Sequence, residues 1–175
     1  MPQTLASQFA PTKIIVPIDF SPSSEAALNA ATGLAQQFHA EIYLLHAIPM
    51  LPITTGMEFP TTFYPATEFL EEAREQAKQK FQEMVSVLSG VGVEASYGIE
   101  VGNDVVGNVL MVIDHEHTDL IVISTHGMSG WRPMVFGSIA EKIVKLVECP
   151  LLLLRSVKPT TVEHATKSVS STKRS

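Results

Sequence analysis

Leu120-Ile-Val-Ile-Ser124-Thr-His-Gly-Met-Ser-Gly-Trp-Arg-Pro-Met-Val-Phe-Gly-Ser138 is the most informative stretch of this 175-residue chain. It opens on continuous Leu, Ile and Val, which is how a strand buried on both faces of a sheet reads. It closes on Ser138, after which apolar residues recur at helical spacing, at Ile139, Ile143, Val144 and Val147. The stretch therefore predicts a buried strand, a glycine-containing loop and a helix in direct succession.

Strand and helix patterns alternate in the rest of the chain as well. Apolar runs that predict strands lie at 13–18, 41–46, 93–99, 120–124 and 151–155. The run at 93–99 alternates apolar and polar residues, which is typical of a half-exposed or edge strand. Helical stripes separate the first four runs, from Leu28 to Phe38, from Leu70 to Leu88 and from Val105 to Ile113. Helix start signals precede two of these stripes, at Ser21-Pro22 and at Asn103 or Asp104.

This alternation predicts an α/β fold with a five-stranded parallel sheet, open, twisted and Rossmann-like, with helices on both faces. Such sheets bind ligands beyond the carboxyl ends of their strands, at the point where the strand order reverses. The loops after the first and the fourth strand are therefore the first places to look for a site. The expected domain covers 13–155, between a flexible arm at 1–12 and a disordered, Ser-, Thr- and Lys-rich tail at 156–175.

Composition limits the function classes. Apolar residues make up 45% of the chain and charged residues 17%, as in a globular protein. The net charge of −6 argues against a nucleic-acid-binding surface, which needs clustered Lys and Arg. Cys149 is the single cysteine, so an intrachain disulfide and a cysteine-rich metal site are excluded. No secretory signal and no apolar run of about 20 residues is evident, and we expect a cytoplasmic protein without a membrane span.

The loop between Ser124 and Ser138 has two interpretations. In the first, Gly127 turns the chain sharply after the strand, Gly130 lets the loop continue, and Gly137-Ser138 opens a helix whose first amides bind phosphate. In the second, the glycines only make a turn and Ser138 only caps the helix. Ser138-Ile-Ala-Glu141 fits a capping box, in which the serine is the N-cap and Glu141 reaches back to it. Spacing alone leaves both interpretations open.

Other candidate sites give weaker signals. Asp114-His-Glu-His117 together with Asp119 allows a metal site, but a polar helix end explains the same residues. Phosphate-binding P-loop, dinucleotide and hydrolase nucleophile motifs are absent from the sequence, and no nucleophile–base pair can be named. The proline-rich segment 47–66 predicts a long irregular loop, either a surface loop packing its aromatics or a lid or partner surface. We therefore do not expect an enzyme, beyond at most a weak ATPase.

Several separated motifs resemble the universal stress protein family. They are Lys13-Ile-Ile-Val-Pro-Ile-Asp-Phe-Ser21, Leu44-Leu-His-Ala-Ile48, Asp119-Leu-Ile-Val-Ile-Ser-Thr-His-Gly127, Phe136-Gly-Ser-Ile-Ala-Glu-Lys-Ile-Val144 and Cys149-Pro-Leu-Leu-Leu-Leu154. In nucleotide-binding members the phosphate motif is Gly, two residues, Gly, nine residues, Gly and then Ser or Thr. Gly127, Gly137 and Ser138 fit this spacing, whereas Ser124 stands at the first glycine position.

The resemblance implies a strand order of 3-2-1-4-5 and a nucleotide pocket between the first and fourth strands. It implies that ATP, or ADP or AMP, contacts Pro17, Ile18, Asp19, Ala47, Ile123, Ser124, His126, Gly127, Gly130, Gly137, Ser138 and Ile139. Asp19 is then placed near a ribose hydroxyl or a nucleotide-bound Mg²⁺, although as a single residue it equally fits a turn before the first helix. His126 taken alone fits a packed loop histidine as well as a ligand.

Two function classes follow from this resemblance. The first is an adenine-nucleotide-binding module for stress response or signalling, with an unknown regulatory partner. The second is a dimeric interaction module of the same fold that binds no nucleotide, which Ser124 favours. In both, the resemblance implies a homodimer through the last strand, Leu151, Leu152, Leu153 and Leu154, because an exposed apolar edge strand must be paired or covered.

Overall fold

The computed structural model describes residues 9–50, 66–125 and 137–155. Strands and helices alternate along the chain in the order β1 Lys13–Pro17, α1 Pro22–Phe38, β2 Glu41–Pro49, α2 Ala66–Gly90, β3 Ala95–Gly102, α3 Val105–His115, β4 Leu120–Ser124, α4 Ser138–Leu146 and β5 Leu151–Leu154. All paired strands are parallel, and their order across the sheet is β3-β2-β1-β4-β5. The predicted fold class and strand order are confirmed.

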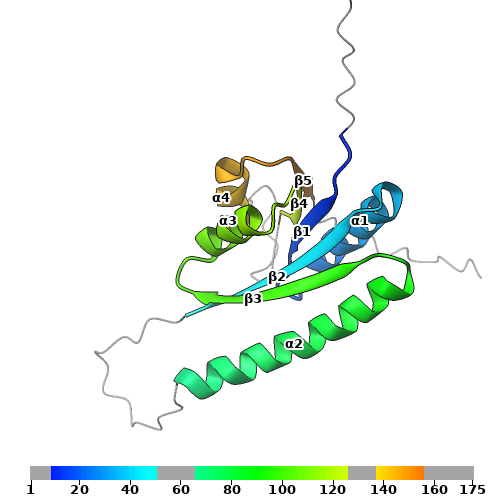
Figure 1. The fold of residues 1–175 in the computed structure, drawn as a ribbon. Coiled ribbons are helices and arrows are strands. Elements are labelled where there is room, and N and C mark those ends of the chain that lie inside the picture. Colours follow the sequence, from blue (N-terminus) through cyan, green and yellow to red (C-terminus); the bar gives the residue numbers. More distant parts are fainter. Residues whose placement is uncertain (1–8, 51–65, 126–136, 156–175) are drawn as a thin grey trace, which may run out of the picture.

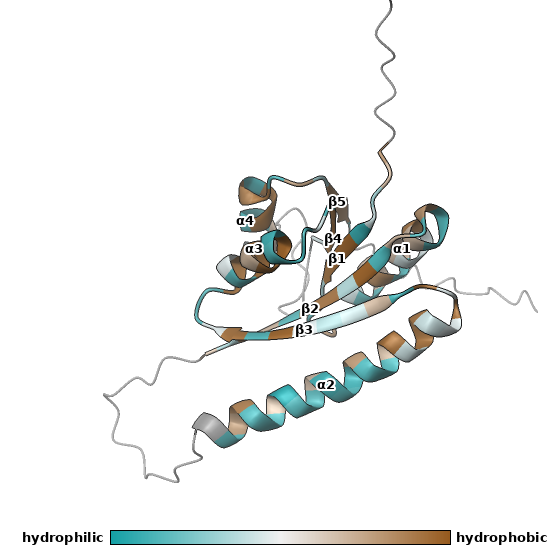
Figure 2. Cartoon of the chain, viewed as in Figure 1, coloured by the Kyte–Doolittle hydropathy of each residue, from teal (hydrophilic) through white to brown (hydrophobic). Residues whose placement is uncertain are grey.

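The helices cover both faces of the sheet, α1 and α2 one face and α3 and α4 the other (Figure 1). Each face carries its own hydrophobic core. Along β1, Ile14 and Val16 pack toward α1 and α2, whereas Ile15 packs toward α3 and α4. Apolar residues are concentrated in the central strands, while α2 is largely hydrophilic along its length (Figure 2). The continuous apolar runs of β1 and β4 therefore follow from burial on both faces.

The helix starts differ in how they are capped. The Ser21 hydroxyl accepts a hydrogen bond from the Ser24 amide at 3.2 Å, and the Asp104 carboxylate accepts one from the Gly107 amide at 3.0 Å. Helix α4 has Gly137 as its N-cap, which has no side chain to cap with. The predicted capping box at Ser138 is therefore wrong.

A hydrogen bond directly before the helix explains why the predicted capping box does not form. The Gly137 amide donates to the Thr125 carbonyl at 2.8 Å, so the turn ends one residue earlier and Ser138 is already helical. Glu141 pairs instead with Lys145, whose Nζ lies 2.7 Å from Oε1.

Strands β2 and β3 extend together past the predicted ends. Their register pairs Ala47 with Glu100 and Pro49 with Gly102, so residues 47–49 of the expected irregular segment are strand. Residues 51–65 lie outside the described part of the chain. Gly98 of β3 faces the Tyr43 ring on β2, and a Cβ at position 98 would overlap the Tyr43 Oη.

At the N-terminal end of the domain, the residues directly before β1 are packed and hydrogen-bonded to the rest of the fold. Pro11 is fully buried, and both the amide and the hydroxyl of Thr12 donate to the Asp119 carboxylate, at 2.8 and 2.7 Å. Strand β5 is an edge of the sheet, as expected, and the Leu152 side chain is 37% exposed. In the described part of the chain, every helix is too short or too polar to cross a membrane.

Candidate functional site

A cavity of about 300 Å³ opens at the carboxyl ends of β1 and β4, where the strand order reverses. Its walls come from the ends of β1, β2 and β4 and from the first turns of α1, α3 and α4. The volume lies at the lower end of the range for small-molecule sites, and the convergence of several elements is typical of such sites. The cavity occupies the position that the topology of an open α/β sheet predicts.

Every predicted site residue within the described part of the chain lines this cavity. These residues are Pro17, Ile18, Asp19, Ala47, Ile123, Ser124, Gly137, Ser138 and Ile139. His126, Gly127 and Gly130 lie outside the described residues. The residues that flank them, Thr125 and Gly137, both line the cavity and are joined by the hydrogen bond between the Gly137 amide and the Thr125 carbonyl.

The first turn of α4 brings backbone donors to the cavity. The first intrahelical hydrogen bond runs from the Glu141 amide to the Gly137 carbonyl at 2.9 Å. The amides of Ser138, Ile139 and Ala140 precede it, so their acceptors must come from outside the helix backbone. These three residues line the cavity, and the positive end of a helix dipole suits an anion there.

Gly137 itself is not required by the backbone. Its φ of −58° is available to any residue. Among the described residues, a Cβ there would meet only the Thr125 carbonyl oxygen, at the ordinary contact distance of 3.4 Å. The fold of the described residues therefore accepts a side chain at this position. Because Gly137 lines the cavity, that side chain would reduce the space in the cavity.

Asp19 also lines the cavity and is held there by the start of α1. Its Oδ1 accepts hydrogen bonds from the Ser21 hydroxyl at 2.6 Å and from the Ser21 amide at 3.1 Å. Ser21 is buried and caps α1 through the amide of Ser24, which also lines the cavity. Asp19 thus fulfils the turn role that its position allows and also presents a carboxylate at the cavity wall.

The cavity is lined by both apolar and polar residues. Leu45, Ala47, Val105, Val109 and Ile123 supply apolar surface, which suits an aromatic base. Asp19, Ser24, Ser124 and Ser138 supply carboxylate and hydroxyl groups, which suit a sugar and its phosphates. A nucleotide therefore fits the chemistry of the lining residues.

Several lining residues were missed by the sequence analysis. They are Ser24, Leu45, His46, Pro49, Val105, Val109, Thr125 and Ala140. Val105 and Val109 belong to the apolar stripe of α3, where a core role and a cavity role give the same pattern. The topology carries the missing signal, because the first turn of a helix that follows a parallel strand lies at the carboxyl edge of the sheet.

His46 connects the cavity wall to the core. Its Nδ1 lies 2.7 Å from the Ile18 carbonyl oxygen, and because a carbonyl only accepts, Nδ1 carries the proton and donates. The ring packs at 4.7 Å between centroids against Phe20. Burial lowers the pKa of His46, with the Ile18 carbonyl opposing part of that effect.

The alternative metal site at 114–119 finds no support among the described residues, which contain no group of three metal-ligating side chains. Asp119 accepts hydrogen bonds from Thr12 and from the Lys13 amide, and so fastens the chain before β1. Glu116 pairs with Lys13 at 2.7 Å, and this hydrogen bond is the main cause that lowers the pKa of Glu116. These side chains hold structural contacts.

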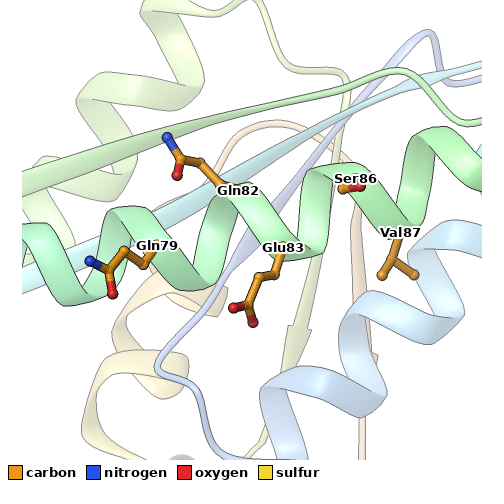
Figure 3. A pocket seen from close by; sticks show the side chains of 5 residues that line it. All are labelled: Gln79, Gln82, Glu83, Ser86 and Val87. Atoms are coloured by element: carbon orange, nitrogen blue, oxygen red, sulfur yellow. The ribbon is translucent and has the colours of Figure 1, made fainter.

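A second hollow, of about 620 Å³, lies along α2 (Figure 3). Its described lining comes from this helix alone: Gln79, Gln82, Glu83, Ser86 and Val87. A ligand site needs groups that converge from several elements. The cavity at the ends of β1 and β4 is therefore the candidate site.

Comparison with known proteins gives one consistent result. The model of the universal stress protein family matches residues 11–155. The universal stress protein YxiE of Bacillus subtilis is 29% identical over 82% of this chain and 98% of its own length. The solved structure of the hypothetical protein MJ0577 of Methanocaldococcus jannaschii is 27% identical, with a TM-score of 0.71 over 83% of this chain and 96% of that one. A universal stress protein of Archaeoglobus fulgidus, solved in complex with dAMP, is 20% identical, with a TM-score of 0.57 over 81% of this chain and 96% of that one.

Proposed function

The chain belongs to the universal stress protein family, and from this premise we propose that it is an adenine-nucleotide-binding module for stress response or signalling that acts as a cytoplasmic homodimer. The nucleotide is ATP, ADP or AMP, and it occupies the cavity at the carboxyl ends of β1 and β4. The base lies against the apolar wall formed by Val105, Val109 and Ile123, and the phosphates lie at the start of α4.

One observation carries the proposal. Helix α4 begins at the cavity with a glycine N-cap, whereas α1 and α3 are capped by side chains. A phosphate is a natural acceptor for the amides of Ser138, Ile139 and Ala140, because it satisfies their hydrogen-bonding capacity and complements the helix dipole. The dAMP complex of the Archaeoglobus fulgidus protein, which shares this fold, gives independent support for a nucleotide.

Asp19, which the start of α1 holds in the cavity lining, is proposed to contact the nucleotide as well. Its carboxylate suits a ribose hydroxyl, and it is also a candidate ligand for a Mg²⁺ that the nucleotide carries. Mg²⁺ would supply charge neutralisation of the phosphates when bound. Of the two potential bases among the described lining residues, Asp19 is engaged by Ser21 and the Nδ1 of His46 by the Ile18 carbonyl. We therefore expect any ATP hydrolysis to be slower than about one turnover per second.

The homodimer rests on the edge strand β5. Its four leucines form an apolar edge, and natural proteins pair or cover such edges because an open one promotes aggregation. A second copy of β5 across a two-fold axis would extend the sheet and bury Leu152.

The second candidate function is a dimeric module of the same fold without nucleotide. Ser124 favours it, because this serine stands where the family motif has its first glycine and is 9% exposed at the cavity wall. The Ser124→Gly variant separates the two candidates. If the serine crowds the phosphates, glycine tightens ATP binding; if the cavity binds no nucleotide, neither form responds.

The deciding experiment is the nucleotide content of freshly purified protein, released by denaturation and identified by mass. It is followed by calorimetric titration of the emptied protein with ATP, ADP and AMP in the presence of Mg²⁺. Binding of any of the three to wild type or Ser124→Gly supports the proposal. No bound nucleotide and no heat of binding in either form would leave the dimeric module as the better function.

A further inference from the structure

Phe20 adopts a backbone conformation that its side chain disfavours. Its φ is 60°, in the left-handed region where glycine is the usual residue and where a bulky side chain is an outlier. It lies in the short connection between β1 and α1, directly after Asp19 and directly before the N-cap Ser21. Such strained residues persist only where the surrounding structure holds them, and they cluster at functional sites.

Three side chains hold the Phe20 ring. It packs against His46 and Phe81 at centroid distances of 4.7 and 5.4 Å, and Lys80 Nζ lies 4.5 Å from its centroid. Phe81 is fully buried and belongs to α2, so the ring is anchored in the core on the face of the sheet opposite α3 and α4. The aromatic contacts and the cation over the ring stabilise this placement.

Hydrogen bonds fix the backbone on either side of Phe20. The Ile18 amide donates to the Leu45 carbonyl at 2.8 Å, and the Ile18 carbonyl accepts from His46 Nδ1 at 2.7 Å. Ser21 begins α1 and holds the Asp19 carboxylate through two hydrogen bonds. Between these two fixed points, the left-handed turn at Phe20 sets how Ser21 folds back onto the Asp19 carboxylate.

We propose that Phe20 is a positioning residue for the nucleotide site: its ring, held by His46, Phe81 and Lys80, keeps the left-handed turn that places the Asp19 carboxylate at the cavity wall. The inference rests on the proposed function, because it concerns how firmly Asp19 is presented to a nucleotide. A glycine would adopt the turn without strain but would leave it without an anchor. The phenylalanine side chain therefore strains the backbone at position 20 but holds the Asp19 carboxylate in place.

The test compares ATP affinity and thermal unfolding in matched variants. Phe20→Gly keeps the allowed φ and removes the anchor, Phe20→Tyr keeps the ring, and Phe20→Leu keeps apolar volume in case the glycine variant does not fold. Leu34→Ala is the control, because Leu34 packs against the same core cluster from the body of α1. We expect Phe20→Gly to weaken ATP binding about tenfold, Phe20→Leu less, and Phe20→Tyr little, because a loosened carboxylate loses part of a charged hydrogen bond. Leu34→Ala should lower the melting temperature and leave the Kd unchanged.

A double-mutant cycle on ATP affinity distinguishes a positioning role of Phe20 from a role in packing alone. Asp19→Asn should weaken ATP binding less in the Phe20→Gly background than in wild type, because the carboxylate is already misplaced there. Unchanged ATP affinity in Phe20→Gly, or additive effects of the two substitutions, would overturn the proposal. Absence of nucleotide binding in wild type would instead refute the proposed function, and this inference with it.

Discussion

Gly137→Ala is the sharpest perturbation of the candidate site, because the fold tolerates it and a bound phosphate would not. Within the part of the chain that the structure describes, the added Cβ meets only the Thr125 carbonyl oxygen, at 3.4 Å, and the φ of −58° suits alanine. Replacing glycine reduces the freedom of the unfolded chain and stabilises by about 0.4–1 kcal/mol. Alanine is a poorer N-cap than glycine, which costs about 0.5–1 kcal/mol. The two effects nearly cancel, so the melting temperature should change by less than about 2 °C.

Nucleotide affinity should respond far more strongly to the same change. If the phosphates bind the amides of Ser138 and Ile139 as proposed, a Cβ at position 137 takes up space beside them, and loss of one charged hydrogen bond there is worth about 1.5–3 kcal/mol. The Kd for ATP should therefore rise about tenfold to a hundredfold. Titration calorimetry with Mg²⁺ and ATP, beside thermal unfolding of the same samples, measures both quantities.

Gly33→Ala supplies the matched control for this prediction. Gly33 lies exposed within α1, and a Cβ there meets no atom of the described residues within 4 Å. Alanine should stabilise that helix by about 0.5–1 kcal/mol without changing ATP affinity. If Gly137→Ala binds ATP as tightly as wild type, the phosphates do not lie at the start of α4 and the central argument for the site is refuted.

Three further substitutions test other parts of the reasoning. Ser138→Ala should weaken ATP binding about tenfold or more without loss of stability, because this serine is not the helix cap; a clear fall in melting temperature would mean that it caps after all. Leu152→Glu should give a monomer in sedimentation at high micromolar concentration with little change in unfolding, because Leu152 is 37% exposed in the single chain; a persistent dimer would exclude β5 as the interface. Burial lowers the pKa of His46 below its ordinary 6.5, so the unfolded chain takes up the proton more readily and stability should fall as the pH drops from about 7.5 to 5.5. His46→Asn, which keeps a donor near the Ile18 carbonyl, should flatten that dependence, and an equally steep melting-temperature profile in the variant would assign it to other groups.

The apolar runs predicted the sheet because burial on both faces leaves a direct mark on sequence. Ile14, Ile15 and Val16 are all fully buried, and so are Ile121 and Val122. The ends of β2 and β3 were less predictable, because Pro49 and Gly102 belong to strands only by pairing with each other. Local residue preference disfavours strand at both positions, and only the tertiary partner reverses it.

The residues of the candidate site could be predicted where they belong to a sequence motif. They could not be predicted where only the folded chain brings them together. Gly137 and Ser138 were identified from spacing, and the cavity includes both. The cap of α4 was assigned one residue too late, because the hydrogen bond between Gly137 and Thr125 joins residues twelve apart and has no local signature. Phe20 gave no signal either, since a left-handed phenylalanine is read only from the backbone.

The contact between Tyr43 and Gly98 has a consequence for how this chain can change over evolutionary time. A side chain at position 98 would displace the Tyr43 ring, so the two positions are not independent. A lineage that first replaces Tyr43 with a smaller residue opens position 98 to alanine or valine, which suit a strand better than glycine does. A lineage that mutates Gly98 first must push the ring from its place. We therefore expect glycine at 98 to accompany tyrosine at 43 among close descendants, and Tyr43 to be replaced before Gly98.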